Sequence, residues 1–204
     1  MPTLTKSKFT VPLKVQDRIR EQRITLFTPD EFRRIFGMTS EQTKYFLESY
    51  TKRNMFVRLK KGLYALRSAM PREEVIANAL YRPSYLSLEY ALSCHGVIPE
   101  MPYTVTSVTT KSTTAFTVRG KVFSYIKIKR SAFTGYAPEK RGDDTVFIAE
   151  PEKALVDYLY LVSLGKKTVN DRVDISRLDK KKIKAYASLF HRKGLARIVD
   201  ELVR

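Results

Sequence analysis

Two helix-start signals on either side of a single glycine constrain the first third of this chain more than any other feature. Thr28 precedes Pro29 and two acidic residues, a pattern that is typical of the first turn of a helix. Gly37 ends the apolar periodicity of that segment, and Thr39 then stands three residues before Gln42, which is the spacing of a capping box. The pattern predicts two short helices joined by a tight turn.

The flanking segments extend this prediction to a domain. Apolar residues at Val11, Val15 and Ile19 predict a first helix that ends near residue 24, and the helix opened by Thr39 should reach about Lys52. Two extended runs, 56–59 and 63–66, then surround a Lys-Lys-Gly turn and predict a hairpin. Helix, helix, tight turn, helix and hairpin form a winged helix-turn-helix. The alternative is a three-helix domain with a hairpin and no role on DNA.

The charge balance points to a polyanionic partner. The chain has 204 residues, with 38 Lys and Arg against 21 Asp and Glu, which gives a net charge of +17. Residues 1–75 carry about +8, residues 76–164 about +2 and residues 165–204 about +7, so we expect two separate basic surfaces. Nucleic acid is the commonest partner of such a protein, and the alternative is a solvated basic surface.

Cysteine use and hydropathy bear on the compartment. Cys94 is the single cysteine of the sequence, so no disulfide within the chain is expected, which fits a reducing cytoplasm. No apolar segment follows Lys6 and Lys8, so we expect no signal peptide. The longest apolar run, residues 154–164, is too short to span a bilayer. We therefore expect a cytoplasmic protein that does not bind membranes.

The remainder of the chain predicts a second domain. Met70-Pro71 marks the expected boundary, which gives a winged helix-turn-helix domain over 1–70 and a mixed domain over 71–204. Composition and turn signals predict helices over 72–80, from Pro83-Ser84 to His95, from Pro151 to before Gly165, 179–190 and 195–203, and strands over 103–110, 115–118, 121–129 and 145–149. The expected fold class is α+β, with a small sheet and a helical tail in the second domain.

Two stretches of this second domain resemble a known family. Residues 83–109 (PSYLSLEYALSCHGVIPEMPYTVTSVT) and 148–157 (IAEPEKALVD) are similar to the centre of AbiEi-type antitoxins, and the Gly62-Leu63-Tyr64 segment fits the same family. The resembling segments occur in the same order as in that family, and the resemblance covers nearly the whole chain. It implies a winged helix that binds repeats upstream of its own operon and represses it.

The same resemblance implies a role for the second domain. In this family it is held responsible for neutralising a nucleotidyltransferase-like toxin in type IV toxin–antitoxin systems, which act in phage defence by abortive infection. The expected partners are therefore double-stranded DNA of the chain's own promoter region and a protein toxin encoded by a neighbouring gene. The alternative within the same class is a transcriptional regulator without a toxin partner.

The candidate DNA-binding residues lie on the predicted reading helix, the helix before it and the hairpin. With Phe46, Leu47 and Tyr50 directed inward, the exposed face can place donors at base edges and cations at phosphates. Gln42 can bond adenine bidentately, whereas Glu41 and Glu48 argue against a uniformly cationic face. The candidates are Ser40, Gln42, Lys44, Tyr45, Lys52, Arg33, Arg34, Arg58, Lys60 and Lys61.

The basic tail supplies a second set of candidates. Its cations could contact an acidic face of the toxin or further DNA, and the alternative is a solvated helix surface. The family resemblance favours the contact with a toxin. The candidate partner-binding residues are Lys180, Lys181, Lys182, Lys184, Arg192, Lys193 and Arg197.

A metal-dependent nuclease is the rival class. Asp143, Asp144, Glu150, Glu152 and Lys153 are close in sequence, but a nuclease motif usually has one residue between its acid and its lysine. Here Glu152 is adjacent to Lys153, and acids at a helix start have a structural reason. Neighbouring cysteine and histidine side chains on a helix point about 100° apart, so they form no nucleophile–base pair. We expect no enzyme activity, no cofactor and no metal site.

Overall fold

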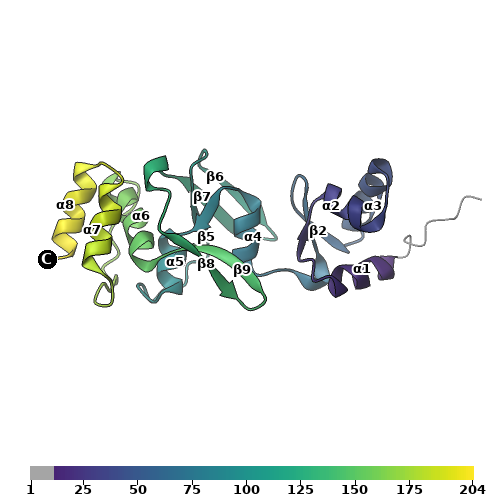
Figure 1. The fold of residues 1–204 in the computed structure, drawn as a ribbon, viewed down its shortest axis with the longest axis horizontal. Coiled ribbons are helices and arrows are strands. Elements are labelled where there is room, and N and C mark those ends of the chain that lie inside the picture. Colours follow the sequence, from purple (N-terminus) through teal and green to yellow (C-terminus); the bar gives the residue numbers. More distant parts are fainter. Residues whose placement is uncertain (1–11) are drawn as a thin grey trace, which may run out of the picture. The chain divides into compact units, whose positions relative to one another are not determined.

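The computed structural model describes residues 12–204, which divide into two compact units that meet between Arg72 and Glu73 (Figure 1). Val11, the expected start of the first helix, lies outside the described residues. Helices and strands are mixed throughout, with a small three-stranded sheet and a larger six-stranded one, which confirms the α+β class. None of the helices between residues 12 and 204 carries an apolar stretch long enough to cross a membrane.

The first unit combines three helices with a small antiparallel sheet. The strand order is β1-β3-β2, and the hairpin of β2 and β3 was expected from the sequence. β1 was not predicted, because two residues are too few for a pattern of alternation. The elements are α1 (Pro12–Glu21), β1 (Leu26–Phe27), α2 (Pro29–Phe36), α3 (Ser40–Lys52), β2 (Phe56–Lys60), β3 (Leu63–Leu66) and a 3-10 turn (Arg67–Ala69).

The predicted caps of α2 and α3 are confirmed. The Thr39 hydroxyl accepts from the Gln42 amide at 3.2 Å, and the Gln42 carbonyl oxygen accepts from the Thr39 amide at 3.0 Å. Thr28 forms a second capping box with Glu31. Gly37 ends α2 with φ +61°, in the left-handed region where a side chain is strained. These caps fix where α2 ends and α3 begins.

Aromatic rings fill the core between these elements. Phe32 of α2 lies 4.5 Å from Phe36 and 5.6 Å from Phe46 of α3, measured between ring centroids. Phe56 of β2 contacts Phe27 of β1 edge-on at 5.5 Å. All five of these phenylalanine rings are buried, so α2, α3 and the sheet share one apolar cluster.

The second unit is built on a mixed sheet with the order β6-β7-β5-β4-β9-β8. β5 runs parallel to β7, β4 runs parallel to β9, and the other neighbours are antiparallel. In Figure 1, α4 lies on one side of this sheet and α5 and α6 on the other, with α7 and α8 beyond α6. The elements are α4 (Glu73–Leu80), β4 (Ser84–Leu86), α5 (Leu88–Cys94), β5 (Val105–Thr109), β6 (Thr114–Val118), β7 (Lys121–Lys127), a 3-10 turn (Arg130–Ala132), β8 (Tyr136–Arg141), β9 (Asp144–Ala149), α6 (Pro151–Ser163), α7 (Lys180–Ser188) and α8 (Lys193–Leu202).

The single helix predicted from Pro83-Ser84 to His95 is wrong. Residues 84–86 form β4, and α5 begins only at Leu88. The chain changes direction there, and the φ angle of Leu88 is +58°. β4 pairs with β5 on one side and with β9 on the other, through Leu86 and Ile148. These long-range pairs override the helical appearance of the local sequence. Strand β8 was also not predicted. It contains Pro138, which the sheet tolerates because β8 is an edge strand.

A buried ion pair holds α6 against the sheet. Lys153 and Asp157 are one helical turn apart, both side chains are fully buried, and their charged groups contact each other. Asp157 also accepts from the Ser87 hydroxyl at 2.8 Å and from the Tyr85 hydroxyl at 3.1 Å. Burial raises the pKa of Asp157 and lowers the pKa of Lys153, so each group depends on the other to stay charged.

Removing one partner of this pair should destabilise the second unit strongly. We expect Asp157→Ala to lower the free energy of unfolding by about 3–5 kcal/mol, because it leaves the Lys153 ammonium buried without a partner. The double variant Lys153→Met with Asp157→Leu should be much closer to the natural protein, since it removes both charges. Denaturant titration measures both effects, and a double variant less stable than Asp157→Ala would contradict this account.

Candidate nucleic-acid interface

The caps and the core determine which face of α3 is exposed. Phe46 and Leu47 are buried as predicted, and Tyr50 is half-buried. Thr43 is also buried, although the sequence pattern did not place it inward. The opposite face exposes most of one aromatic side chain, because Tyr45 is 76% exposed. The exposed residues of this face are Ser40, Glu41, Gln42, Lys44, Tyr45, Glu48 and Lys52.

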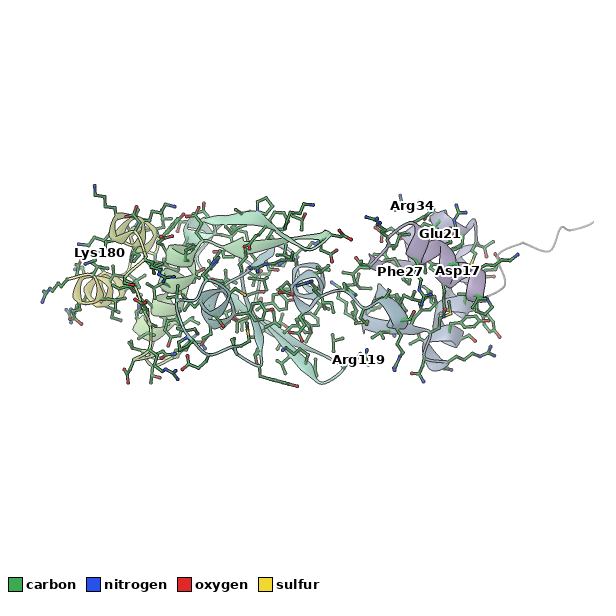
Figure 2. All side chains as sticks on the ribbon, turned by 90° about the horizontal axis from the view of Figure 1, so that it is seen from below. Asp17, Glu21, Phe27, Arg34, Arg119 and Lys180 are labelled. Atoms are coloured by element: carbon green, nitrogen blue, oxygen red, sulfur yellow. The ribbon has the colours of Figure 1, made fainter. Side chains whose placement is uncertain are left out.

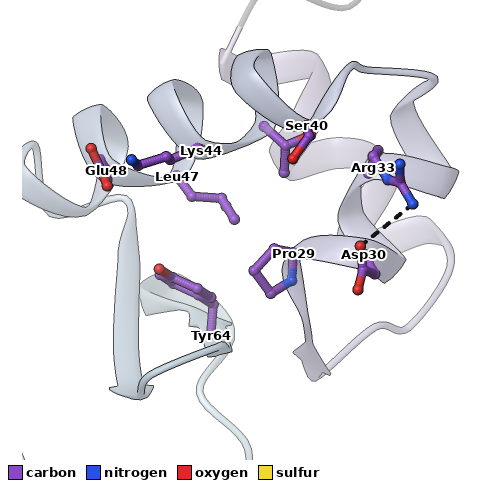
Figure 3. A pocket seen from close by; sticks show the side chains of 9 residues that line it. Pro29, Asp30, Arg33, Ser40, Lys44, Leu47, Glu48 and Tyr64 are labelled. Atoms are coloured by element: carbon purple, nitrogen blue, oxygen red, sulfur yellow. Dashed lines mark ion pairs between the residues drawn. The ribbon is translucent and has the colours of Figure 1, made fainter.

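Three shallow hollows follow this exposed face. The first, of about 160 Å³, lies between α2, α3 and Tyr64 of β3, and Figure 3 shows Ser40, Lys44 and Glu48 around it. The second, of about 370 Å³, is lined by residues of α3 together with Arg58 of β2 and Tyr64. The third lies on the outer side of α3. Its lining residues are Tyr45, Glu48, Ser49, Lys52 and Arg53. The first hollow thus lies between α3 and α2, and the second between α3 and the hairpin.

Several of the predicted cations are available to an external anion. Lys44 and Lys52 of α3, Arg58 of β2 and Lys61 of the hairpin turn are exposed, and none of them forms an ion pair with another residue in the range 12–204. Lys60 is half-buried and has a contact of its own. The structure therefore brings the cations of two separate sequence segments to one side of the first unit.

The two arginines of α2 are partly engaged within their own helix. Arg33 forms an ion pair with Asp30 at 3.5 Å (Figure 3). The Arg34 guanidinium donates to the Asp30 carbonyl oxygen at 3.4 Å, and its side chain lies at the surface in Figure 2. Both are exposed, so the ion pair is screened by water and weak. A phosphate could compete with Asp30 for Arg33.

The role predicted for Gln42 conflicts with its place in the cap. A bidentate contact with adenine uses the carbonyl oxygen of the side chain, and that oxygen already accepts from the Thr39 amide. Gln42 therefore has its NH₂ group free for a base, while its oxygen is engaged by the start of α3. Glu41 and Glu48 add acceptors, so the exposed face of α3 carries both signs of charge.

Sequence reasoning missed part of this surface. Tyr64 reads as a core residue of the hairpin, and its ring does stack on Phe27 at 6.1 Å, yet the residue also lines two of the hollows. Thr51 lines the second hollow, and its buried hydroxyl has no hydrogen-bond partner among the described residues. No local pattern marks these residues, because their position beside the hollows depends on how the hairpin packs against α3.

The seven cations predicted in the tail separate into two groups. Lys182 pairs with Glu150 at 3.0 Å, and this hydrogen bond is the largest cause that lowers the pKa of Glu150. Lys184 pairs with Asp200 at 3.4 Å. The Arg192 guanidinium donates to the Ser163 carbonyl oxygen at 2.6 Å, at the end of α6. These three cations have partners inside the fold.

The other four of the seven predicted cations are exposed. They lie on α7 and α8, and no ion pair joins them to any residue that the structure describes. Figure 2 shows one of them, Lys180, extended from the start of α7. This group consists of Lys180, Lys181, Lys193 and Arg197.

Glu150, Glu152 and Lys153, which the nuclease alternative would need together, each contact a different part of the fold. Glu150 contacts Lys182 and the Tyr186 hydroxyl, the latter at 3.0 Å. Glu152 is buried and accepts from the Asp179 amide at 3.1 Å, and Lys153 is buried against Asp157. Within residues 12–204 no three acidic, histidine or cysteine side chains gather in a metal-binding arrangement.

Comparison with known proteins identifies no relative of this chain. No protein-family model matches the chain, and no curated protein matches it. The family resemblance thus rests on the sequence itself, on residues 83–109, 148–157 and 62–64. The function has to be argued from the charges and surfaces described above.

Stability measurements should separate the structural role of Gln42 from the exposed role of Lys44. We expect Gln42→Ala to lower the free energy of unfolding by about 0.5–1 kcal/mol, because the Thr39 amide loses its acceptor at the start of α3. Lys44→Ala should change it by less than about 0.5 kcal/mol. Denaturant titration of both variants tests this, and equal effects would mean that the cap contributes nothing.

Proposed function

We propose that the first unit is a winged helix-turn-helix that binds double-stranded DNA, with α3 in the major groove and the β2–β3 hairpin as the wing. One observation carries the proposal: Lys44, Lys52 and Arg58 come from two elements, flank the hollows along α3 and have no ion pair among the described residues. Phosphates are the anions that such a row of cations along an exposed helix would neutralise. The net charge of +17 supports the same partner.

The polar and aromatic groups on α3 would supply the sequence preference. The exposed Tyr45 ring can contact a thymine methyl group, and Glu41 and Glu48 can accept from the amino group of cytosine. Ser40 lies at the first turn of α3, where it can reach a base or a phosphate. The resemblance to AbiEi-type proteins names the DNA: repeats in the chain's own promoter region. We therefore propose a transcriptional autorepressor.

Binding to the chain's own upstream DNA tests this function. We expect a preference of about 10³-fold or more over a scrambled duplex near physiological salt. Lys44→Ala, Lys52→Ala and Arg58→Ala combined should weaken binding, and each lost phosphate contact should reduce the salt slope of log K by about 0.9. Fluorescence anisotropy at several salt concentrations measures both quantities.

The matched control for this measurement is an exposed cation on another helix. Lys14 lies on α1, away from the three hollows, so Lys14→Ala should leave the preference unchanged. Equal and weak binding of both duplexes by the natural protein would contradict the proposal. A loss of log K in the control that is about one third of the loss in the triple variant would mean that only the total charge matters, because the control removes one cation and the triple variant three.

For the second unit we propose neutralisation of a nucleotidyltransferase-like toxin. The resemblance supplies this role, and the four exposed cations of α7 and α8 are the observation that favours a contact with an acidic protein surface. Lys182, Lys184 and Arg192 are left out of this contact, because they have partners within the fold. The whole chain would then act as autorepressor and antitoxin.

Co-expression with the product of the neighbouring gene tests the antitoxin role. We expect the full chain to restore growth, and the triple variant of Lys44, Lys52 and Arg58 to restore it as well, because its changes lie in the other unit. Glutamate substitutions at Lys180, Lys181, Lys193 and Arg197 should abolish the rescue. A failure of the natural chain to rescue growth would leave a regulator without a toxin partner.

A further inference from the structure

The two outer strands of the six-stranded sheet differ in how open they are to pairing. β8 and β6 each have one neighbour, so each exposes a row of backbone groups along its outer side. β8 and β9 are joined by the two-residue turn 142–143, which makes Arg141 and Asp144 a hydrogen-bonded pair. By alternation, Pro138 faces outward opposite Phe147. The amide of Phe147 binds Asn78 on the inner side, which agrees with this alternation.

β8 is therefore blocked against a further strand. Pro138 has no amide hydrogen at a position where the amide would point outward, and its ring obstructs an approaching chain. Charged residues follow it at Glu139, Lys140 and Arg141, and Glu139 pairs with Arg141 at 3.0 Å. Proline and charge are the usual means by which natural proteins prevent pairing at a sheet edge.

β6 lacks both of these features. Its sequence, Thr-Ala-Phe-Thr-Val, has no proline and no charge and favours extended structure. The two-residue turn 119–120 makes Val118 and Lys121 a hydrogen-bonded pair, so the backbone groups of Ala115 and Thr117 point away from β7. Both residues are exposed. β6 therefore offers two amide hydrogens and two carbonyl oxygens at the spacing of a partner strand.

The surroundings of β6 are basic. No acidic residue occurs between Glu100 and Glu139, a stretch that includes β5, β6 and β7. Lys111 lies over the Tyr81 ring, which packs in turn against Phe116 of β6. Arg119 lies at the tip of the β6–β7 hairpin (Figure 2), and Lys127 ends β7. Of the cations near β6, Lys121 has an acidic partner, Glu73.

We propose that β6 is a docking edge for an acidic extended segment of a partner protein, which adds to the sheet as a further strand. The open backbone groups of Ala115 and Thr117 supply the pairing, and the cations around the hairpin select an acidic segment. A second copy of this chain fits less well, because its own β6 would bring the same cations to the contact. A nucleic acid cannot match the alternating donors and acceptors of a strand edge.

The probe is a synthetic peptide of alternating glutamate and valine with a fluorescent label, titrated with the full chain at low ionic strength. We expect saturable binding, and Thr117→Pro should weaken it by about tenfold or more because the proline removes an outward amide hydrogen. Thr117→Val keeps that hydrogen and should bind within about twofold of the natural protein. The β6–β7 hydrogen bonds do not involve this amide, so the hairpin should persist in both variants.

A second probe does not depend on the folding of any variant. The same peptide methylated on alternate backbone nitrogens retains its charge but cannot pair with a strand, so we expect it to lose binding by about tenfold or more. Equal binding of the two peptides would mean attraction by charge alone and would overturn the proposal, as would no binding of the unmodified peptide. Sedimentation that shows a dimer dissociated by Thr117→Pro would assign the edge to a second copy and also overturn it.

Discussion

The buried pair of Lys153 and Asp157 is the interaction on which the second unit depends. It connects α6 with β4 and the residue that follows it, because Asp157 accepts from Tyr85 and Ser87. It also reaches the tail, because the Lys153 ammonium lies 5.1 Å from the centroid of the Phe190 ring, between α7 and α8. Two buried charges are stable only when each compensates the other, so sheet, helix and tail have to pack together around them.

The contacts of Glu150, Glu152 and Lys153 explain why these closely spaced charged residues have a structural role. Glu150 reaches α7 through Lys182, Glu152 holds the amide of Asp179 before that helix, and Lys153 turns into the core. Each of the three side chains therefore contacts a different part of the fold. The tail contacts α6 a second time just before α8, where Arg192 donates to the last residue of α6, Ser163. What remains outside these contacts is the set of exposed cations that we assign to a partner.

In the first unit the same division between structural and exposed groups occurs within one helix. Phe46 and Leu47 bind α3 to the core, and the capping box sets its first turn. Gln42 belongs to the cap, although its position alone suggested a contact with a base. Lys44 and Lys52 form no ion pair with any residue between 12 and 204, so the proposed binding to DNA depends on them together with Arg58 of the hairpin.

The sequence by itself determined the features that depend on neighbouring residues. Thr28, Gly37 and Thr39 marked the ends of α2 and α3, because caps and left-handed turns are decided within a few residues of the chain. The exposed face of α3, and most of the candidate interface with it, followed from the helical period. Its hollows did not, because Tyr64 and Arg58 reach them from the hairpin.

Only the tertiary structure decided the rest. Residues 84–86 became a strand because β5 and β9 bind them from both sides. Some tail cations are engaged and others are not, and only the fold shows which. Lys182 meets Glu150, and Arg192 meets Ser163, although the partners are far apart in sequence. No strand was predicted over residues 136–141, and they became the edge strand β8 because β9 pairs with them, with Pro138 at a position whose outer side needs no amide hydrogen. In each case the deciding energy comes from hydrogen bonds and charges that meet only when the chain is folded.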